Sequence, residues 1–275
     1  MKVLLTNDDG IHAPGLMALY RELAGDFELE VVAPESEMSA IGHAISLISP
    51  LRVQTVRKNG GFFGYSVTGT PADCVKIAVQ ELMVPPPDII LSGINLGANV
   101  GINVLYSGTV SAATEGAFLG ISSAAISLDT QRNPDFRFAA VFSREIIRFL
   151  MENDLKEGTA LNINIPALPA DEITGVSIAR QSLSRFKEKY ESRIDPRGNV
   201  YYWLSGETTY EHEKPGTDAA CLKENRITIT PIHHDLTSPD DMARLKSRSL
   251  PRYHKPCERT GFRGKEAIAR SLNKS

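Results

Sequence analysis

Short apolar runs recur along the first part of the chain, separated by polar and glycine-rich segments. The runs cover residues 3–5, 29–33, 89–92, 124–128 and 160–165. The first four runs are short, continuous and rich in β-branched residues, which is typical of parallel strands buried on both faces. The pattern therefore predicts a parallel sheet.

Helical spacing of apolar residues fills the intervals between these runs. It predicts helices over residues 15–24, 71–83, 109–119 and 138–151. Before the second of these, Thr70 has the position of an N-cap, Pro71 suits the first helical position, and Asp73 completes a capping box. The alternation of strands and helices predicts an α/β fold with a doubly wound, mainly parallel sheet.

The pattern changes after residue 175. Strand-like segments at 199–204 and 226–232 predict a β-rich C-terminal arm over residues 176–243. Its aromatic residues Tyr201, Tyr202 and Trp203 favour either a hairpin packed on its own domain or an oligomer contact, since aromatic residues are enriched at interfaces. Residues 244–275 hold ten Lys or Arg and two acids, which predicts a partly disordered basic tail. We therefore expect a main domain at 1–175, then the arm and the tail.

Composition narrows the class of partner. The 275 residues include 30 basic and 33 acidic side chains, a net charge of -3, which gives no electrostatic basis for binding nucleic acid. The three cysteines, Cys74, Cys221 and Cys257, have neither disulfide-framework nor zinc spacing. No run has the length of a signal peptide or a membrane span. We expect a cytoplasmic protein that binds a small ligand, with no membrane partner.

Two adjacent carboxylates follow the first apolar run directly. Asp8 and Asp9 come just after residues 3–5, and Gly10 allows the chain to bend there so that both side chains converge. Carboxylates within about 4–6 Å of each other repel unless a cation or a shared proton offsets their charge. The pair therefore indicates a metal ion or a shared proton at the carboxyl end of a strand. The alternative is a simple turn, because Asn-Asp-Asp-Gly is common turn chemistry.

Two further loops follow strands and supply polar groups. After residues 89–92, glycines and asparagines repeat every four residues, including Asn95 and Asn99. Such a loop allows close backbone approach, and asparagine either binds a hard cation or anion or occupies a left-handed turn. Ser107, Gly108 and Thr109 then open a helix whose N-terminus suits a phosphate, although Ser107 also suits a plain N-cap.

Motifs for other chemistries are absent from the sequence. It contains no GxGxxG after the first strand, no P-loop, no Gly-x-Ser-x-Gly elbow and no HExxH. The segment His233-His234-Asp235 favours a turn at the end of a strand over a set of metal ligands. These absences narrow the chemistry, and the strand-end carboxylates, the loops and the helix N-terminus together favour a hard metal ion and a phosphate at one edge of the sheet.

These residues resemble the SurE family of stationary-phase survival proteins, which are metal-dependent nucleoside monophosphate phosphatases. The resemblance covers residues 1 to about 240 and rests on these segments: Asn7-Asp8-Asp9-Gly10, Pro14-Gly15, Ala33-Pro34, Ser39-Ala40, Gly69-Thr70-Pro71-Ala72-Asp73-Cys74-Val75, Ser92-Gly93-Ile94-Asn95 through Gly101, Tyr106-Ser107-Gly108-Thr109-Val110-Ser111-Ala112-Ala113, Thr217-Asp218, Thr230-Pro231 and Asp235-Leu236-Thr237.

The resemblance implies a Rossmann-like, three-layer fold with a site at the carboxyl ends of the strands. It implies that one divalent metal ion, Mg²⁺ or Mn²⁺, is held by Asp8, Asp9, Ser39 and Asn95. It also implies a homodimer or homotetramer that exchanges C-terminal arms. Residues 219–225 and the tail depart from the family pattern.

The resulting hypothesis is hydrolysis of nucleoside 5′-monophosphates, and of 3′-monophosphates as a second class, by a metal-activated water. Asp8 and Asp9 are the catalytic candidates, with Asp9 preferred as the proton acceptor. Asn99, Ser107, Gly108 and Thr109 are the candidates for binding the phosphate oxygens. An aspartyl-phosphate route stays open, although the usual Asp-x-Asp signature is absent. The alternative function is a nucleotide-sensing module that binds without turnover.

Overall fold

The structure is a computed structural model, and it describes residues 1–251 except 131, 184–185 and 209–212. The chain forms two compact units, Met1–His234 and Asp235–Ser275. Most of the predicted basic tail, residues 252–275, lies outside the described residues. Within the described part, none of the helices has the length and apolar character needed to cross a membrane.

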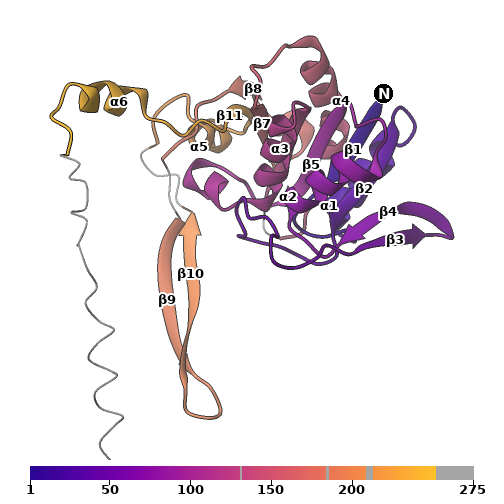
Figure 1. The fold of residues 1–275 in the computed structure, drawn as a ribbon, viewed down its shortest axis with the longest axis horizontal. Coiled ribbons are helices and arrows are strands. Elements are labelled where there is room, and N and C mark those ends of the chain that lie inside the picture. The colour runs from indigo at the N-terminus through magenta and orange to yellow at the C-terminus, as the bar shows by residue number, and fades with distance from the viewer. Residues whose placement is uncertain (131, 184–185, 209–212, 252–275) are drawn as a thin grey trace, which may run out of the picture. The chain divides into compact units, whose positions relative to one another are not determined.

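A nine-stranded sheet forms the centre of the first unit (Figure 1). In order across the sheet, the strands are β3 (Val53–Lys58), β4 (Gly61–Val67), β2 (Glu28–Pro34), β1 (Lys2–Thr6), β5 (Ile89–Leu96), β6 (Ser122–Asp129), β7 (Thr159–Pro166), β11 (Arg226–His233) and β8 (Gly175–Ile178). The six strands from β4 to β7 are parallel, whereas β3 and β11 run antiparallel to their inner neighbours. The predicted parallel sheet is confirmed.

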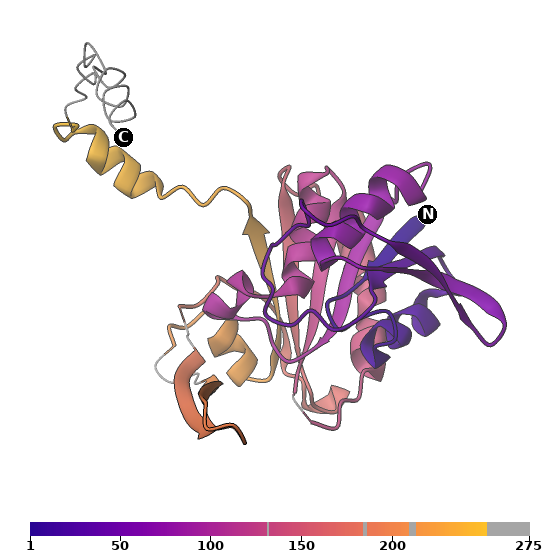
Figure 2. The same cartoon turned by 60° about the horizontal axis from the view of Figure 1, so that its bottom comes forward.

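Helices cover both faces of this sheet, as a doubly wound fold requires (Figure 2). The helical segments are α1 (Pro14–Leu23), α2 (Pro71–Ile77), η1 (Ala78–Leu82), η2 (Gly101–Leu105), α3 (Gly108–Phe118), α4 (Arg137–Glu152), η3 (Ala170–Glu172) and α5 (Asp218–Lys223). Helices α1 and α4 pack on one face with the largest apolar cluster, and α2 and α3 pack together on the other. The predicted Rossmann-like, three-layer architecture is confirmed.

The start of α2 follows the predicted capping chemistry. The Thr70 hydroxyl accepts a hydrogen bond from the Asp73 N–H at 3.1 Å, and the Asp73 carboxylate accepts one from the Thr70 N–H at 3.0 Å. The predicted helix over 71–83 divides after Ile77, where the five-residue π-helix η1 begins. The sequence therefore located the start of this helix better than its interior.

The first unit extends well beyond residue 175, where sequence analysis placed a domain boundary. Strand β11 pairs with β7 and β8 pairs with β11, so both belong to the main sheet rather than to the arm. The physical reason is burial: Ile227 and Ile229 of β11 join the largest apolar cluster. Local strand patterns do not reveal which sheet a strand joins.

The arm itself is one hairpin, β9 (Phe186–Ile194) and β10 (Val200–Thr208), which forms a separate two-stranded sheet (Figure 1). Tyr201 is 40%, Tyr202 65% and Trp203 56% exposed. Successive residues of a strand point to opposite faces. Both faces of the hairpin therefore expose aromatic side chains in the described chain.

The second unit contains α6 (Pro239–Lys246), and the hydroxyl of its N-cap Ser238 accepts a hydrogen bond from the Asp241 N–H. The predicted start of the tail at residue 244 therefore falls inside a helix. Sequence analysis missed α6 because its residues have a strongly polar composition, with two acids in the first turn and two basic residues in the last.

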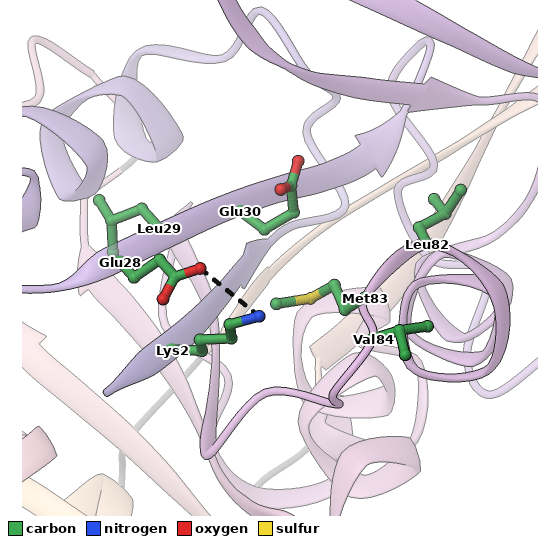
Figure 3. A pocket seen from close by; sticks show the side chains of 7 residues that line it. All are labelled: Lys2, Glu28, Leu29, Glu30, Leu82, Met83 and Val84. Carbon is green, nitrogen blue, oxygen red and sulfur yellow. Dashed lines mark ion pairs between the residues drawn. The ribbon is translucent and has the colours of Figure 1, made fainter.

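A small pocket lies at the amino ends of β1 and β2, the sheet edge opposite to Asp8 and Asp9 (Figure 3). It is lined by Lys2, Glu28, Leu29, Glu30, Leu82, Met83 and Val84. Lys2 pairs with Glu28 at 3.5 Å, and burial raises the pKa of Glu30. Because ligands of open α/β sheets bind at the carboxyl ends of strands, this pocket is not the candidate active site.

A close contact between Gly15 of α1 and the backbone of β5 provides a test of the packing. A Cβ atom at Gly15 would overlap the carbonyl oxygen of Ile94, whereas one at the exposed Gly25 would meet nothing within 4 Å. We expect Gly15→Ala to lower the free energy of unfolding by about 2 kcal/mol, because the helix must move away from the strand. Gly25→Ala should change it by less than about 0.5 kcal/mol. Urea denaturation of both variants measures this, and equal stabilities would contradict the packing.

Candidate active site

The carboxylate pair lies just beyond the end of β1, where the chain leaves the sheet. Gly10 has a φ of +95°, which permits the bend, and the Asn7 side-chain amide closes it by donating to the Gly10 carbonyl at 3.0 Å. A Cβ at Gly10 would lie 3.2 Å from the Ser36 backbone. The segment is thus a turn, as its composition suggested, and the turn also brings the two carboxylates to the edge of the sheet.

Asp8 is buried against the N-terminus of α3. The Thr109 hydroxyl and the backbone N–H groups of Gly108 and Thr109 donate to its carboxylate. Gly108 permits this approach, because a Cβ there would lie 2.7 Å from the Asp8 Cβ. Burial raises the pKa of Asp8, and the hydrogen bond from Thr109 opposes that rise. The helix dipole also favours a negative charge at this position.

Asp9 is less buried and lies in a more negative environment. Burial, then the charges of Asp8 and Glu37, raises its pKa to about 6, while a hydrogen bond from the Leu96 N–H opposes the rise. Two or three carboxylates in one place are unfavourable without a cation. The electrostatics of the pair therefore suit a positively charged ligand.

The loop after β2 brings Ser39 to the pair. The Met38 N–H donates to the Asp8 carbonyl at 2.8 Å, and the Ser39 hydroxyl donates to Glu37. Ala40, the next residue, has a φ of 56°. The predicted ligand Ser39 is therefore one residue from a contact with Asp8, on an exposed stretch of loop.

The end of β5 brings Asn95 to the same edge. The strand has an irregularity between Gly93 and Asn95, and the side-chain amide of Asn95 donates to the Gly97 carbonyl at 2.7 Å. Its neighbour Leu96 contacts Asp9 through the backbone. The hydrogen bond described for the Asn95 side chain uses its nitrogen and not its oxygen. The oxygen is therefore available to bind a metal ion.

The predicted phosphate contacts are engaged within the protein. The Ser107 hydroxyl caps α3 by accepting the Val110 N–H at 3.1 Å. Gly108 and Thr109 contact Asp8, as described above. The Asn99 side chain donates to the Ser127 hydroxyl at 2.9 Å, and its backbone N–H donates to Asn164 at 2.7 Å. These contacts hold Asn99 against the sheet, and none of them directs its side chain toward Asp8 and Asp9.

The donor set fits a hard divalent metal ion. Asp8 and Asp9 supply anionic oxygens, Ser39 and Asn95 supply neutral ones, and such ions prefer oxygen ligands. The buried Asn7 side-chain oxygen has no hydrogen-bond partner in the described part of the chain. In that part, no three His, Cys, Asp or Glu side chains lie close enough together to hold a metal ion by themselves. A metal ion here would therefore depend on neutral oxygens beside the two aspartates.

The His233-His234 segment lies at the end of β11. The His234 ring nitrogen Nδ1 lies 3.3 Å from the Gly158 carbonyl oxygen, and the two histidine rings stack at 4.4 Å. The segment therefore lies at the end of a strand, as its position in the sequence suggested.

A family model described as Survival protein SurE matches residues 3–188. The chain belongs to the SurE family. The 5′-nucleotidase SurE of Syntrophus aciditrophicus is 56% identical over 248 residues, which cover 90% of this chain and 93% of that protein. The 5′-nucleotidase SurE of Syntrophobacter fumaroxidans is 53% identical, with 86% and 95% covered.

The likeness to the SurE family extends to the fold. The crystal structure of the SurE protein from Aquifex aeolicus matches with a TM-score of 0.78 and 37% sequence identity. The match covers 90% of this chain and 98% of that one. The family resemblance inferred from the motifs is therefore confirmed.

Sequence analysis missed two groups around this SurE site. Glu37 adds negative charge beside Asp9, and no motif marked it. Asp218 was recognised as part of a family motif but had no assigned role. Its buried carboxylate accepts hydrogen bonds from the N–H groups of Gly101 and Ser182, at 3.0 and 2.8 Å, and so joins the Asn/Gly loop to the chain before the hairpin.

The raised pKa of Asp9 predicts how the metal-free protein responds to pH. An acid with a folded-state pKa near 6 destabilises the folded state above that pH, and this effect disappears as the pH falls toward its unfolded value near 3.8. With EDTA at pH 7.5, Asp9→Asn should therefore melt a few degrees higher than wild type. The difference should shrink steadily between pH 6.5 and pH 4.

Thermal melts over this pH range check the prediction. Asp171→Asn, which changes an exposed carboxylate of η3, is the control and should follow the wild type at every pH. An Asp9→Asn protein less stable than wild type at pH 7.5 would contradict the assigned electrostatics.

Proposed function

We propose that the protein is a divalent-metal-dependent phosphomonoesterase that hydrolyses nucleoside 5′-monophosphates, with 3′-monophosphates as a second substrate class. The observation that carries the proposal is the pair Asp8 and Asp9 at the end of β1, with Asp8 against the N-terminus of α3. Its relatives named 5′-nucleotidase SurE support the substrate class. Carboxylates for a metal ion and a helix N-terminus for an anion stand at one place.

We assign one Mg²⁺ or Mn²⁺ ion to Asp8, Asp9, Ser39 and Asn95. When bound, the ion neutralises phosphate charge and makes a water molecule more acidic. Asp8 and Asp9 provide the charge, and the hydrogen bonds from α3 hold Asp8 in one orientation. The Ser39 hydroxyl donates to Glu37 in this structure and would have to turn away from it to join the set.

Asp9 is the preferred proton acceptor. Asp8 is buried and engaged by the hydroxyl and backbone of Thr109, whereas Asp9 is partly exposed and its one backbone donor is Leu96. A general base needs a carboxylate oxygen free to reach the proton it takes. We assign the phosphate oxygens to Asn99, Ser107, Gly108 and Thr109, because the N-terminus of α3 favours negative charge. In the described structure these groups contact Ser127, Val110 and Asp8, so they would exchange those contacts for the phosphate.

The test of function is phosphate release from purified protein with a panel of nucleoside monophosphates, Mn²⁺ or Mg²⁺, and then EDTA. We expect metal-dependent release that falls at least about 10³-fold in Asp8→Asn and Asp9→Asn, because each change removes charge from the site. Asp171→Asn should keep wild-type rates. Nucleotide binding by wild type without release would contradict the proposal and favour the nucleotide-sensing module.

Stereochemistry at phosphorus distinguishes the two routes to hydrolysis. A direct attack by water inverts a chiral phosphate, whereas an aspartyl-phosphate intermediate formed on Asp8 or Asp9 gives retention through two inversions. We expect inversion, because Asp8 is held by α3 and is poorly placed to act as a nucleophile. Retention would establish the covalent route.

The same proposal includes a homo-oligomer and a cytoplasmic location. Exposed Tyr202 and Trp203 on the hairpin suit a contact with a second copy in a homodimer or homotetramer. The free thiols of Cys74 and Cys221 suit the reducing cytoplasm.

We expect light scattering to give a mass of two or four chains for wild type, and a smaller mass for the double variant Tyr202→Ser, Trp203→Ser. An unchanged mass would exclude the hairpin as the contact.

A further inference from the structure

A buried ion-pair cluster on α3 lies outside the carboxylate pair and has no part in the chemistry above. Glu115 is 5% exposed, and its two carboxylate oxygens contact two basic side chains. His43 Nε2 lies 2.7 Å from one oxygen and Lys76 Nζ lies 3.0 Å from the other. Burial alone would raise the pKa of Glu115, but these two partners bring it below its ordinary value. Glu115 therefore keeps its negative charge within the protein, offset by its basic partners.

The two partners come from different parts of the chain. Lys76 belongs to α2, which packs beside α3 (Figure 1). His43 belongs to the long loop between β2 and β3, the same loop that carries Ser39. Glu115 therefore joins a helix to a loop and not only a helix to a helix.

The His43 ring has further contacts on the same helix. Its Nδ1 atom lies 3.3 Å from the Thr114 hydroxyl oxygen, and its ring stacks on Phe118 at 5.2 Å with an angle of 7° between the planes. Three side chains of α3 thus surround one imidazole. Such a set of contacts fixes both the position and the orientation of the ring.

The loop around His43 is fixed at a few backbone points. Met38 donates to the Asp8 carbonyl, and the Gly42 N–H donates to the Tyr106 carbonyl at 2.9 Å. The Ala44 carbonyl accepts a hydrogen bond from the Thr70 hydroxyl at 2.7 Å. Ser39 lies between the hydrogen bonds of Met38 and Gly42. Among the described contacts, its side chain reaches only Glu37, which belongs to the same loop. Its position therefore depends on what holds the loop on either side.

We propose that Glu115 and His43 are positioning residues that hold the loop over residues 38–43 in place. They thereby keep the Ser39 hydroxyl beside Asp8 and Asp9 and set the affinity for the divalent metal ion. The role of Ser39 as a ligand rests on the proposed function. The position of the loop does not, so the two can be tested separately. A hydrogen bond to a buried carboxylate is among the stronger contacts available to a loop.

His43→Ala is the most informative variant, because Glu115 keeps its ion pair with Lys76 and the fold keeps a satisfied buried charge. We expect Mn²⁺ binding, measured by calorimetry on the metal-free full-length protein, to weaken about tenfold, the lower end of the effect of removing a group behind a metal ligand. Amide hydrogen exchange over residues 39–46 should become faster. The melting temperature of the metal-free protein should fall by only a few degrees.

Three further variants separate positioning from general destabilisation. Ile48→Ala changes a fully exposed side chain of the same loop and should leave binding and exchange unchanged. His43→Gln should restore most of the affinity, because its amide N–H can donate to Glu115. The double variant His43→Ala, Glu115→Gln should bind Mn²⁺ no more weakly than His43→Ala, since His43→Ala already removes the contact between Glu115 and the loop, and the remaining pair with Lys76 joins two helices.

The outcomes distinguish this inference from the proposed function. Unchanged Mn²⁺ affinity and unchanged exchange in His43→Ala would overturn the positioning role, whether or not the wild type hydrolyses nucleotides. Weaker Mn²⁺ binding with no change in exchange, or with no rescue in His43→Gln, would also overturn it. A wild type that binds Mn²⁺ but releases no phosphate would refute the proposed function and leave the positioning test valid. A wild type that binds no Mn²⁺ would overturn both the metal assignment and its link to the loop.

Discussion

The contact between Asp8 and the N-terminus of α3 is the interaction on which the site depends. It joins the end of β1 to the start of a helix about a hundred residues later, and it uses the donors that a helix N-terminus leaves free. A helix N-terminus and a strand-end carboxylate satisfy each other there. The same contact places a second carboxylate, Asp9, where its charge is not satisfied by the protein alone. Unfavourable charge at Asp9 is thus a consequence of the packing that orders Asp8.

Polar groups around this contact show how the edge of the sheet is kept rigid. Asn99 is held by Asn164 and Ser127, and Gly101 is held by Asp218 from a distant part of the chain. Each of these buried groups has hydrogen-bond partners, as a low-dielectric environment requires. The Asn/Gly loop is therefore held by the body of the protein as well as by local contacts, which explains how a glycine-rich segment can form a defined site.

Much of the main sheet could be predicted because its signals are local. Parallel strands appear as continuous apolar runs, and the capping residues Thr70 and Asp73 mark a helix start within four positions. Strand β11 was located but placed in the wrong part of the fold, because its pairing with β7 is a long-range contact. Helix α6 was missed, because its composition is strongly polar and it offers few apolar positions to recognise.

The sequence by itself determined the α/β class, the family and the chemical character of the site: paired aspartates, a glycine for the bend and an Asn/Gly loop. These follow from residue types and short spacings, which act within a few residues of the chain. Only the tertiary structure decided that Asp8 occupies the start of α3, that Asn99 faces the sheet, and that Glu115 reaches His43 across 72 positions. Such contacts depend on how distant segments pack together, and no local pattern records that.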